Sequence, residues 1–292
     1  MISILTLLLV AGMAAGTYLL VKNISIKQQI QSGRSQTSQV IKQKLEKVEE
    51  FKYYLDTGNK SIGEQMKQMD LVIIEPIEMQ QMYINAAQES GTLVYGYINT
   101  MEGDKWNNEL YRKFIEEDFY KDKNGDRIYF EEWDSYMMDM TSPHYQEVML
   151  EEIQKQVVSK GLDGVFLDTV GNIDSFLPES EQTEQNEELV KFIKKIKQQN
   201  DMSVAQNWGF HTLMNYTAHY VDFIMWEDFS YRVVGKDEWS LEMMKELQKV
   251  RKKHGTQVMA VGFTDQEKSR ELADKNGFKF VFNPAGSYYN EW

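Results

Sequence analysis

The chain of 292 residues contains no cysteine. This excludes disulfide bonds, thiolate metal sites, a cysteine nucleophile and a lipid-modified N-terminal cysteine. Histidine is scarce, with four copies and no HExxH-type pair, so a histidine-rich zinc site is not expected. Basic residues are outnumbered: residues 51–292 carry 26 Lys/Arg against 42 Asp/Glu, a net charge of −16. Nucleic acid is therefore a poor partner, and a cationic ligand is a better one.

Charged residues are also missing from Ile2 to Val21. Twenty apolar residues in a helix span about 30 Å, the thickness of a bilayer core. A cleaved signal peptide normally begins with a basic region, which is lacking here, and the apolar run continues past the small residues AGMAAG. The pattern favours an uncleaved transmembrane anchor over a cleaved signal. The nearest basic residues lie C-terminal to this run, and the positive-inside rule alone would place the rest of the chain in the cytoplasm.

The segment after the apolar run, residues 22–50, is rich in Gln, Ser and Lys and poor in apolar residues. This composition is typical of a polar, partly helical stalk. We therefore predict three parts: an anchor or signal at 1–21, a stalk at 22–50 and one globular domain at 51–292. Apolar residues make up 42% of the chain and aromatic residues 12%, which is enough for a packed core.

Short apolar runs alternate with helical patterns throughout the globular part. Helices are predicted at 146–159, closed by Gly161, and at 185–199. Such alternation is typical of a parallel sheet covered by helices, and the absence of a Gly-rich phosphate loop argues against a doubly wound sheet. We predict an α/β fold: a (β/α)8 TIM barrel of eight parallel strands with one accessory strand, preceded by the N-terminal transmembrane helix. The strand signals lie at 52–55, 71–76, 92–99, 136–140, 163–168, 203–209, 222–228, 257–264 and 278–284.

The stretch GLDGVFLDTVGN, residues 161–172, places an aspartate directly after an apolar strand. A charged side chain such as Asp168 is not expected in the interior of an apolar strand. In (β/α)8 barrels, however, the catalytic residues lie at the C-terminal ends of the strands. Other predicted strands also end on polar residues, and we expect these to line one acidic cleft. They are Glu75, Asn99, Asp139, Gln206, Asn207, Trp208, Glu227, Asp228 and Asn283.

Asp168 and Glu227 form the carboxylate pair that glycoside hydrolysis requires. Trp226 beside Glu227 is expected to keep it protonated by desolvation. The competing interpretation is that both carboxylates merely cap the helices that follow them. Asp139 either orients a partner or is a structural carboxylate. Candidate sugar-stacking aromatics, each with core packing as the alternative, are Tyr97, Trp106, Trp133, Trp208, Trp226 and Tyr231.

The order of these motifs, above all DGVFLDTV and WEDFSY, resembles glycoside hydrolase family 114, the endo-α-1,4-polygalactosaminidases. It is similar to the hydrolase domain of bacterial Pel polysaccharide systems. The resemblance implies a (β/α)8 barrel acting on α-1,4-linked galactosamine, partly N-acetylated. It implies Asp168 as nucleophile, Glu227 as acid/base and Asn207 in the substrate groove. One departure is Gly171, where members of the family often carry Asp.

The sequence thus predicts a single-pass membrane protein with an extracellular catalytic domain, or a secreted one if the N-terminal segment is cleaved. Its substrate would be a cationic aminosugar polysaccharide, exopolysaccharide secretion proteins are candidate partners, and neither a metal nor an organic cofactor is expected. The predicted catalytic residues are Asp168 and Glu227. The predicted substrate-binding residues are Glu75, Tyr97, Asn99, Asp139, Asn207, Trp208, Trp226 and Tyr231.

The nucleophile and acid/base roles predict retention of the α configuration, with the two carboxyl groups about 5–5.5 Å apart rather than the roughly 6.5–9.5 Å of inverting enzymes. Asp168 should be ionised, and Glu227 should have the higher pKa, raised by Trp226 and by the charge of Asp168. Two alternatives stay open. One is a non-hydrolytic carbohydrate-binding barrel of a secretion complex. The other is a metal-dependent hydrolase or lyase that holds Mg²⁺ with Glu75, Asp139 and Asp168.

Overall fold

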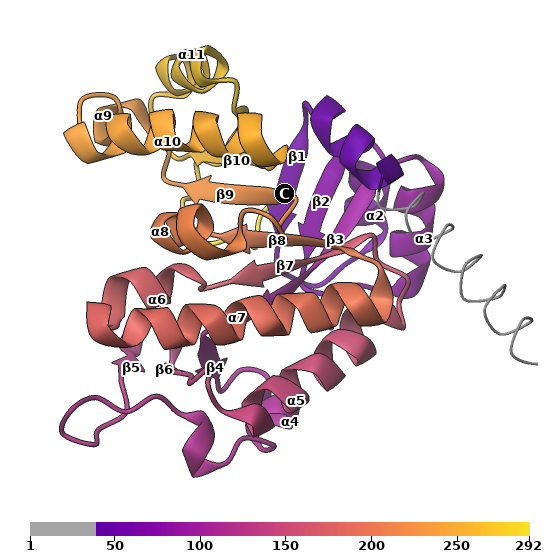
Figure 1. Cartoon of the computed structure of the whole chain (residues 1–292). Helices are drawn as coiled ribbons and strands as arrows, with labels where there is room; N and C mark the ends of the chain where they lie inside the picture. Colours follow the sequence, from indigo (N-terminus) through magenta and orange to yellow (C-terminus); the bar gives the residue numbers. More distant parts are fainter. Residues whose placement is uncertain (1–38) are drawn as a thin grey trace, which may run out of the picture. The chain divides into compact units, whose positions relative to one another are not determined.

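The computed structural model describes residues 39–292, and its centre is a sheet of eight parallel strands (Figure 1). The strands follow one another in chain order, β1-β2-β3-β7-β8-β9-β10-β11, and form a nearly closed barrel. Within residues 39–292, no backbone ladder joins β11 to β1. The predicted (β/α)8 barrel is confirmed. Its strands are β1 (Phe51–Tyr54), β2 (Leu71–Ile74), β3 (Leu93–Asn99), β7 (Gly164–Asp168), β8 (Ser203–Asn207), β9 (Phe223–Glu227), β10 (Gln257–Gly262) and β11 (Lys279–Phe282).

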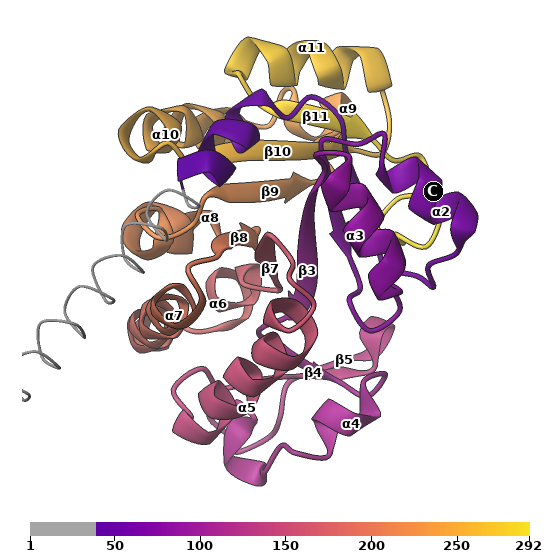
Figure 2. The ribbon, with the colours of Figure 1, turned by 90° about the vertical axis from the view of Figure 1, so that its right-hand side faces the viewer.

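Helices surround the outside of the strands (Figure 2). Local signals set their limits: in α10 (Glu238–His254), Asp237 caps the first turn by accepting a hydrogen bond from the Ser240 amide, and Gly255 ends the helix at a φ of 79°. The other helices are α2 (Lys60–Met66), α3 (Gln81–Glu89), α4 (Asn108–Tyr111), α5 (Pro143–Ile153) with a π-helical turn Gln154–Val158, α6 (Gly171–Phe176), α7 (Glu179–Asn200), α8 (Phe210–Thr212) with a π-helical turn Leu213–Thr217, α9 (Tyr231–Val234) and α11 (Gln266–Asn276).

Two apolar layers follow from the alternation of side chains along each strand. In β9, Phe223 and Met225 belong to the cluster that fills the barrel, whereas Ile224 and Trp226 belong to the cluster between the strands and the helices. Residues 39–47 are helical, and the inner cluster includes their buried Ile41 and Leu45. The buried residues of the compact unit therefore begin before Phe51.

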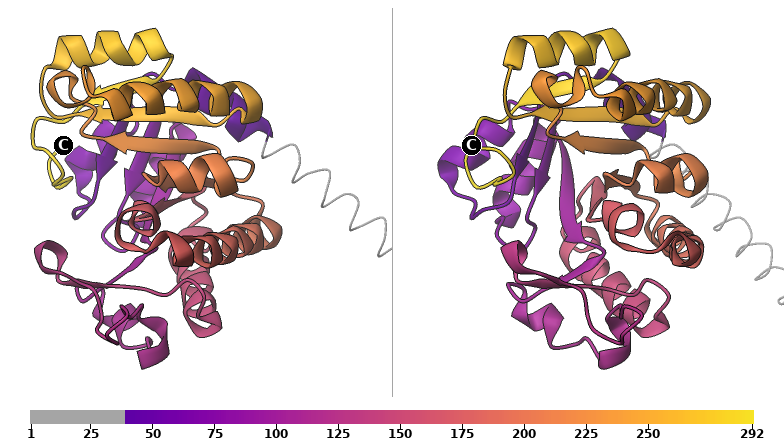
Figure 3. Two further views of the ribbon diagram at one scale, coloured as in Figure 1. Left: turned by 60° about the vertical axis from the view of Figure 1, so that its left-hand side comes forward. Right: turned by 90° about the vertical axis from the view of Figure 1, so that its left-hand side faces the viewer.

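A small antiparallel sheet lies in the connection between β3 and α5, in the order β4-β6-β5. Its strands are β4 (Glu102–Asp104), β5 (Tyr129–Phe130) and β6 (Ser135–Met137). Of the nine strand signals, eight coincide with the barrel strands and the one at 136–140 overlaps β6, although the sequence did not single it out as the accessory strand. The strands β4 and β5 were not predicted because each is three residues or shorter. Figure 3 shows this magenta segment extending beyond the strands of the barrel.

Within residues 39–292, no helix combines the length and the apolar character needed to span a membrane. The predicted anchor, residues 2–21, and the first part of the predicted stalk lie outside the described residues.

Candidate active site

Three neighbouring strands, β7, β8 and β9, end on Asp168, Asn207 and Glu227, with all three side chains at one end of the barrel. The amide nitrogen of Asn207 donates one hydrogen bond to Asp168 Oδ1, at 2.8 Å, and another to Glu227 Oε1. Because both oxygens are hydrogen-bonded to the same nitrogen, they are at most about 6 Å apart. The two carboxyl groups therefore face each other across one amide.

The residue after each of these side chains has a left-handed backbone: φ is 59° at Thr169, 52° at Trp208 and 50° at Asp228. This conformation is uncommon for residues other than glycine, and such strain clusters at functional sites. Local bonds offset it at Thr169, whose hydroxyl donates to Asn99 Oδ1 and accepts from the Met101 amide, each at 2.8 Å. Each of the three strands thus turns sharply, immediately after the side chain that it presents.

Gly171 lies against the turn at Trp208. A Cβ at position 171 would come within 2.8 Å of Trp208 Cβ and within 3.2 Å of the Gly209 nitrogen. These are backbone atoms or atoms attached to the backbone, so a side chain here would displace the turn. At Gly171, α6 and the end of β8 therefore approach each other closely.

Burial raises the pKa of both carboxyl groups of the pair. For Asp168 it is opposed by hydrogen bonds from the Asn207 amide, the Tyr97 hydroxyl and the Thr169 backbone. Burial, followed by the negative charge of Asp168, raises the pKa of Glu227 to about 7, while bonds from Tyr289 and Asn207 act in the opposite direction. Asp168 has more donors than Glu227, which favours the ionised form of Asp168 and the protonated form of Glu227 near neutral pH.

The pair opens into a pocket of about 930 Å³ at the mouth of the barrel. Aromatic side chains form much of its wall: Tyr53, Tyr97, Trp106, Trp133, Trp208, Phe210, Trp239 and Tyr289. Six carboxylates line it: Glu75, Glu102, Asp104, Asp168, Asp174 and Glu227. No lysine or arginine occurs among the lining residues in the described part of the chain. The mouth is therefore acidic and aromatic.

Five predicted substrate-binding residues, Glu75, Tyr97, Asn99, Asn207 and Trp208, line this mouth pocket. Glu75 is buried at the end of β2 and accepts a hydrogen bond from the Ile77 amide at 2.9 Å. Burial raises the pKa of Glu75 to about 8, more strongly than the Ile77 bond lowers it.

Trp226 was predicted in the groove, and the structure corrects this. Its ring is fully buried and packs against Phe210, Phe229 and Trp239 on the helical side of β9. Adjacent residues of a strand point to opposite faces, so Trp226 must point away from the mouth if Glu227 points into it. Trp226 is therefore not the group that desolvates the Glu227 carboxyl.

Asp139 and Tyr231 are also absent from the mouth pocket. Asp139 lines a separate surface hollow, where its Oδ1 accepts hydrogen bonds from the Thr141 amide at 2.8 Å and from Gln185 Nε2 at 2.7 Å. Tyr231 begins α9, and its ring lies beside the Lys268 ammonium. In both cases a loop after the strand carries the residue away from the mouth.

The metal-dependent alternative required Glu75, Asp139 and Asp168 to meet, and Asp139 does not line the pocket that holds the other two. Within residues 39–292, no three Asp, Glu, His or Cys side chains are grouped as ligands for a metal ion.

Sequence reasoning missed several residues of the mouth. Tyr53 lies in the predicted strand at 52–55. The alternation of side chains between the two faces of that strand could have identified it as a residue that points into the barrel. Tyr289 lies in the segment after β11, has no sequence signal, and reaches Glu227 Oε2 with its hydroxyl at 2.5 Å. The other missed residues include Glu102, Asp104, Asp174 and Trp239.

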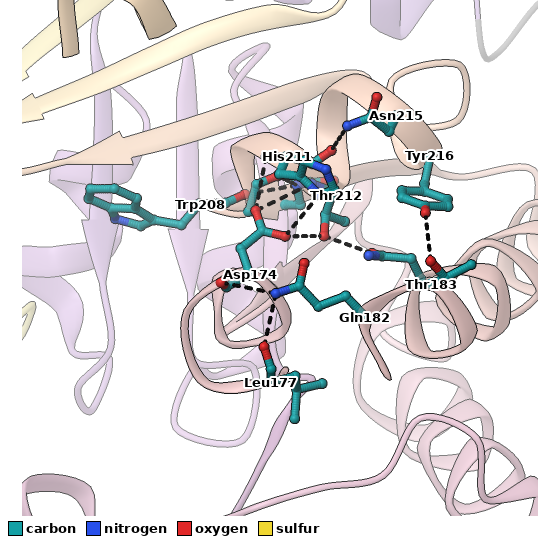
Figure 4. Close-up of polar contacts among 12 residues, drawn as sticks. Asp174, Leu177, Gln182, Thr183, Trp208, His211, Thr212, Asn215 and Tyr216 are labelled. Atoms are coloured by element: carbon teal, nitrogen blue, oxygen red, sulfur yellow. Dashed lines mark hydrogen bonds and ion pairs between the residues drawn. The ribbon is translucent and has the colours of Figure 1, made fainter. Parts of the chain in front are cut away.

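Asp174 of α6 supports the wall beside Trp208 (Figure 4). Its carboxylate accepts hydrogen bonds from the His211 amide at 2.9 Å and from the Thr212 hydroxyl at 2.7 Å. A carboxylate at the start of a helix satisfies free backbone N–H groups. Asp174 thereby connects α6 to the start of α8.

A (β/α)8 barrel that presents two buried, hydrogen-bonded carboxylates at the C-terminal ends of its strands has the architecture of a glycoside hydrolase. Residues 31–285 match glycoside-hydrolase family GH114, and the chain belongs to this family of enzymes. A comparison with curated proteins returned no match.

Solved structures share the fold. The glycoside hydrolase domain of PelA from Pseudomonas aeruginosa is 17% identical, with a TM-score of 0.63 over 82% of this chain and 97% of that one. Ega3 from Aspergillus fumigatus, in complex with galactosamine, is 14% identical, with a TM-score of 0.60 over 80% and 90%. The maltogenic α-amylase AmyB from Thermotoga neapolitana is 13% identical, with a TM-score of 0.57 over 83% and 68%.

Proposed function

We propose that this glycoside hydrolase cleaves an α-1,4-linked polymer of galactosamine and N-acetylgalactosamine with retention of configuration. The observation that carries the proposal is the pair of buried carboxyl groups bridged by Asn207. Their oxygens are at most about 6 Å apart, which is below the ~6.5–9.5 Å of inverting enzymes and is compatible with the ~5–5.5 Å of retaining ones.

In the first step, the Asp168 carboxylate attacks the anomeric carbon, and Glu227 gives its proton to the departing glycosidic oxygen. This forms a glycosyl ester on Asp168 and leaves Glu227 ionised. In the second step, Glu227 takes a proton from water, whose oxygen attacks the anomeric carbon and releases Asp168. The pKa of about 7 at Glu227 suits a group that acts first as an acid and then as a base.

The charge of the mouth supports an aminosugar substrate. Deacetylated galactosamine carries an ammonium group, and the mouth pocket has six carboxylate side chains and, within the described residues, no basic one except the imidazole of His211. Attraction between the two raises the local concentration of a cationic polymer. The structure of Ega3 with galactosamine is of a protein similar in fold, which agrees with this substrate class.

The uncharged segment at residues 2–21 motivates the cellular part of the proposal: an uncleaved anchor that holds the catalytic domain outside the cell, near exopolysaccharide secretion proteins. Protease added to intact cells or spheroplasts is expected to digest the domain. Protection until the cells are lysed would place the domain in the cytoplasm, as the positive-inside rule alone suggests, and would refute the extracellular role.

The reaction is tested by incubating the full chain with partly deacetylated α-1,4-galactosaminogalactan. We expect oligosaccharides by mass spectrometry and α anomers as the first-formed products by NMR. First-formed β anomers would overturn the retaining mechanism. Binding of the polymer without cleavage would favour the non-hydrolytic carbohydrate-binding alternative.

A further inference from the structure

Tyr289 belongs to the segment that follows β11, beyond the residues that match the family. Its side chain is nevertheless only 6% exposed. Its backbone oxygen accepts a hydrogen bond from the Leu55 amide at 2.6 Å, and its ring stacks on Tyr53 with the ring centroids 3.9 Å apart. Tyr289 is thus fixed to the end of β1, across the gap between the first and last strands of the barrel.

The hydroxyl of Tyr289 meets Glu227 Oε2 at 2.5 Å, while Asn207 donates to the other oxygen, Oε1. The two donors therefore hold both oxygens of the Glu227 carboxyl. Asn207 also donates to Asp168, whereas the Tyr289 hydroxyl donates to Glu227 and, within residues 39–292, to no other side chain of the pair. The two contacts are thus separable by mutation.

We propose that Tyr289 is a positioning residue for Glu227, and that the segment after β11 thereby contributes to the active site. The inference rests on the proposed function, in which Glu227 is the acid/base. The Tyr289 hydroxyl fixes the rotation of the Glu227 carboxyl group, so that the Glu227 proton is directed toward the glycosidic oxygen. It also stabilises the ionised form that appears after that proton has been given up.

The titratable groups that face Glu227 are Asp168 on β7, Tyr53 on β1 and Tyr289 itself, with Tyr97 of β3 beyond Asp168. Burial and the negative charge of Glu227 keep the pKa of Tyr289 well above its ordinary value, so its hydroxyl stays a donor at working pH. The bond from Tyr289 lowers the pKa of Glu227. Its removal should therefore extend the protonated form of Glu227 to higher pH.

The experiment compares Tyr289→Phe with Tyr288→Phe in the full chain. Tyr288 is the adjacent, exposed tyrosine, and the substitution removes only a 3.5 Å contact with Glu132. For Tyr289→Phe we expect kcat/KM to fall about tenfold and the basic limb of its pH profile to move up by about one pH unit. For Tyr288→Phe both should stay unchanged. NMR titration of ¹³C-labelled glutamate, without substrate, should show the same shift of the Glu227 pKa.

Fluorotyrosine incorporated at position 289 gives the opposite test, because a more acidic phenol is a stronger donor and should move the limb to lower pH. A fall in kcat/KM with an unmoved limb would overturn the proposal, since a merely structural role has that effect. An equal shift in Tyr288→Phe would also overturn it. If Tyr289→Phe does not fold, the fluorotyrosine protein decides. If the wild-type chain cleaves no polymer, the proposed function fails and the NMR titration still decides this inference.

Discussion

The mouth pocket and the surface hollow lined by Asp139 are both acidic, and they differ in what surrounds their carboxylates. The mouth pocket buries Glu75, Asp168 and Glu227, and burial raises the pKa of each. The second hollow, about 390 Å³ and lined by Asp139, exposes Glu116 beside Arg127 and Lys121, whose hydrogen bonds lower the pKa of Glu116 to about 2. A count of acidic residues does not separate these hollows. What separates them is the balance between burial and neighbouring cations: burial is the largest influence on the pKa of the mouth carboxyl groups, whereas the exposed Glu116 is governed by hydrogen bonds from Arg127 and Lys121.

The largest effect on activity is expected when the charges of Asp168 and Glu227 are removed. Glu227→Gln and Asp168→Asn should each lower turnover by about 10³-fold or more with the fold retained, and the double variant should be little worse, because the two groups act as one unit. Glu181→Gln, in the second hollow, is the matched control and should keep normal turnover. Reducing-end assays and thermal unfolding measure both properties. Near-normal turnover in either single variant would refute its assigned role.

A smaller effect is expected when the shape of the mouth changes and its charges do not. Gly171→Ala places a Cβ within 2.8 Å of Trp208 Cβ, which must move together with its left-handed turn. We expect turnover to fall about tenfold, because displacement of groups near the reacting atoms is costly. Steady-state kinetics with thermal unfolding measure this. Unchanged kinetics would show that the close approach has no part in the site.

Glu75 and Glu116 should contribute to stability with opposite pH dependence. The folded pKa of Glu75 is about 8, above its ordinary value of 4.5, so the folded state keeps a proton that the unfolded chain loses. Stability should therefore fall as pH rises from about 4.5 to 8, and Glu75→Gln should raise the melting temperature at pH 9 by a few degrees, but not at pH 4.

Glu116→Gln is the matched control for that prediction. The folded pKa of Glu116 is lowered, so its contribution is present above its ordinary pKa of 4.5 and is lost as pH falls toward 2. Because Glu116 is exposed, the change should be small at every pH. Calorimetry from pH 2 to pH 9 measures both variants, and a melting temperature that Glu75→Gln leaves unchanged at pH 9 would contradict the buried, protonated state.

The smallest effect on activity is expected at Asp139. Asp139→Ala removes the acceptor for Thr141 and Gln185 and should cost about 1–2 kcal/mol of unfolding free energy, while turnover stays normal. Denaturant unfolding measures the free energy of unfolding, and steady-state kinetics measure turnover. Loss of turnover in a well-folded variant would return Asp139 to the substrate site and weaken the contrast between the hollows.

Much of the barrel could be predicted from sequence for a physical reason. Parallel strands covered on both faces are continuous apolar runs, so they stand out between helical segments. The strand β6 was found as one of nine signals, but not as the accessory one, and β4 and β5 are too short to carry a pattern of their own. Asp168 and Glu227 were found because a carboxylate directly after such a run is costly unless it leaves the core.

The direction of side chains was predicted less well. Trp226 and Glu227 were both assigned to the cleft, although neighbours in a strand point to opposite faces. Asp139 lies within the strand signal at 136–140, but the strand there belongs to the small antiparallel sheet and ends at Met137. Tyr231 follows the signal at 222–228, but a loop leads it to α9, and nothing local in the sequence specifies the path of that loop.

Local composition and periodicity are enough to establish the alternation of strands and helices, the acidic charge and the two carboxylates at strand ends. Three contacts could be known only from the folded chain: the Asn207 amide bridges Asp168 and Glu227, Gly171 lies against Trp208, and Tyr289 reaches Glu227 from 62 residues away. Those contacts depend on closure of the sheet into a barrel, which brings together strand ends and a final segment that are far apart along the chain.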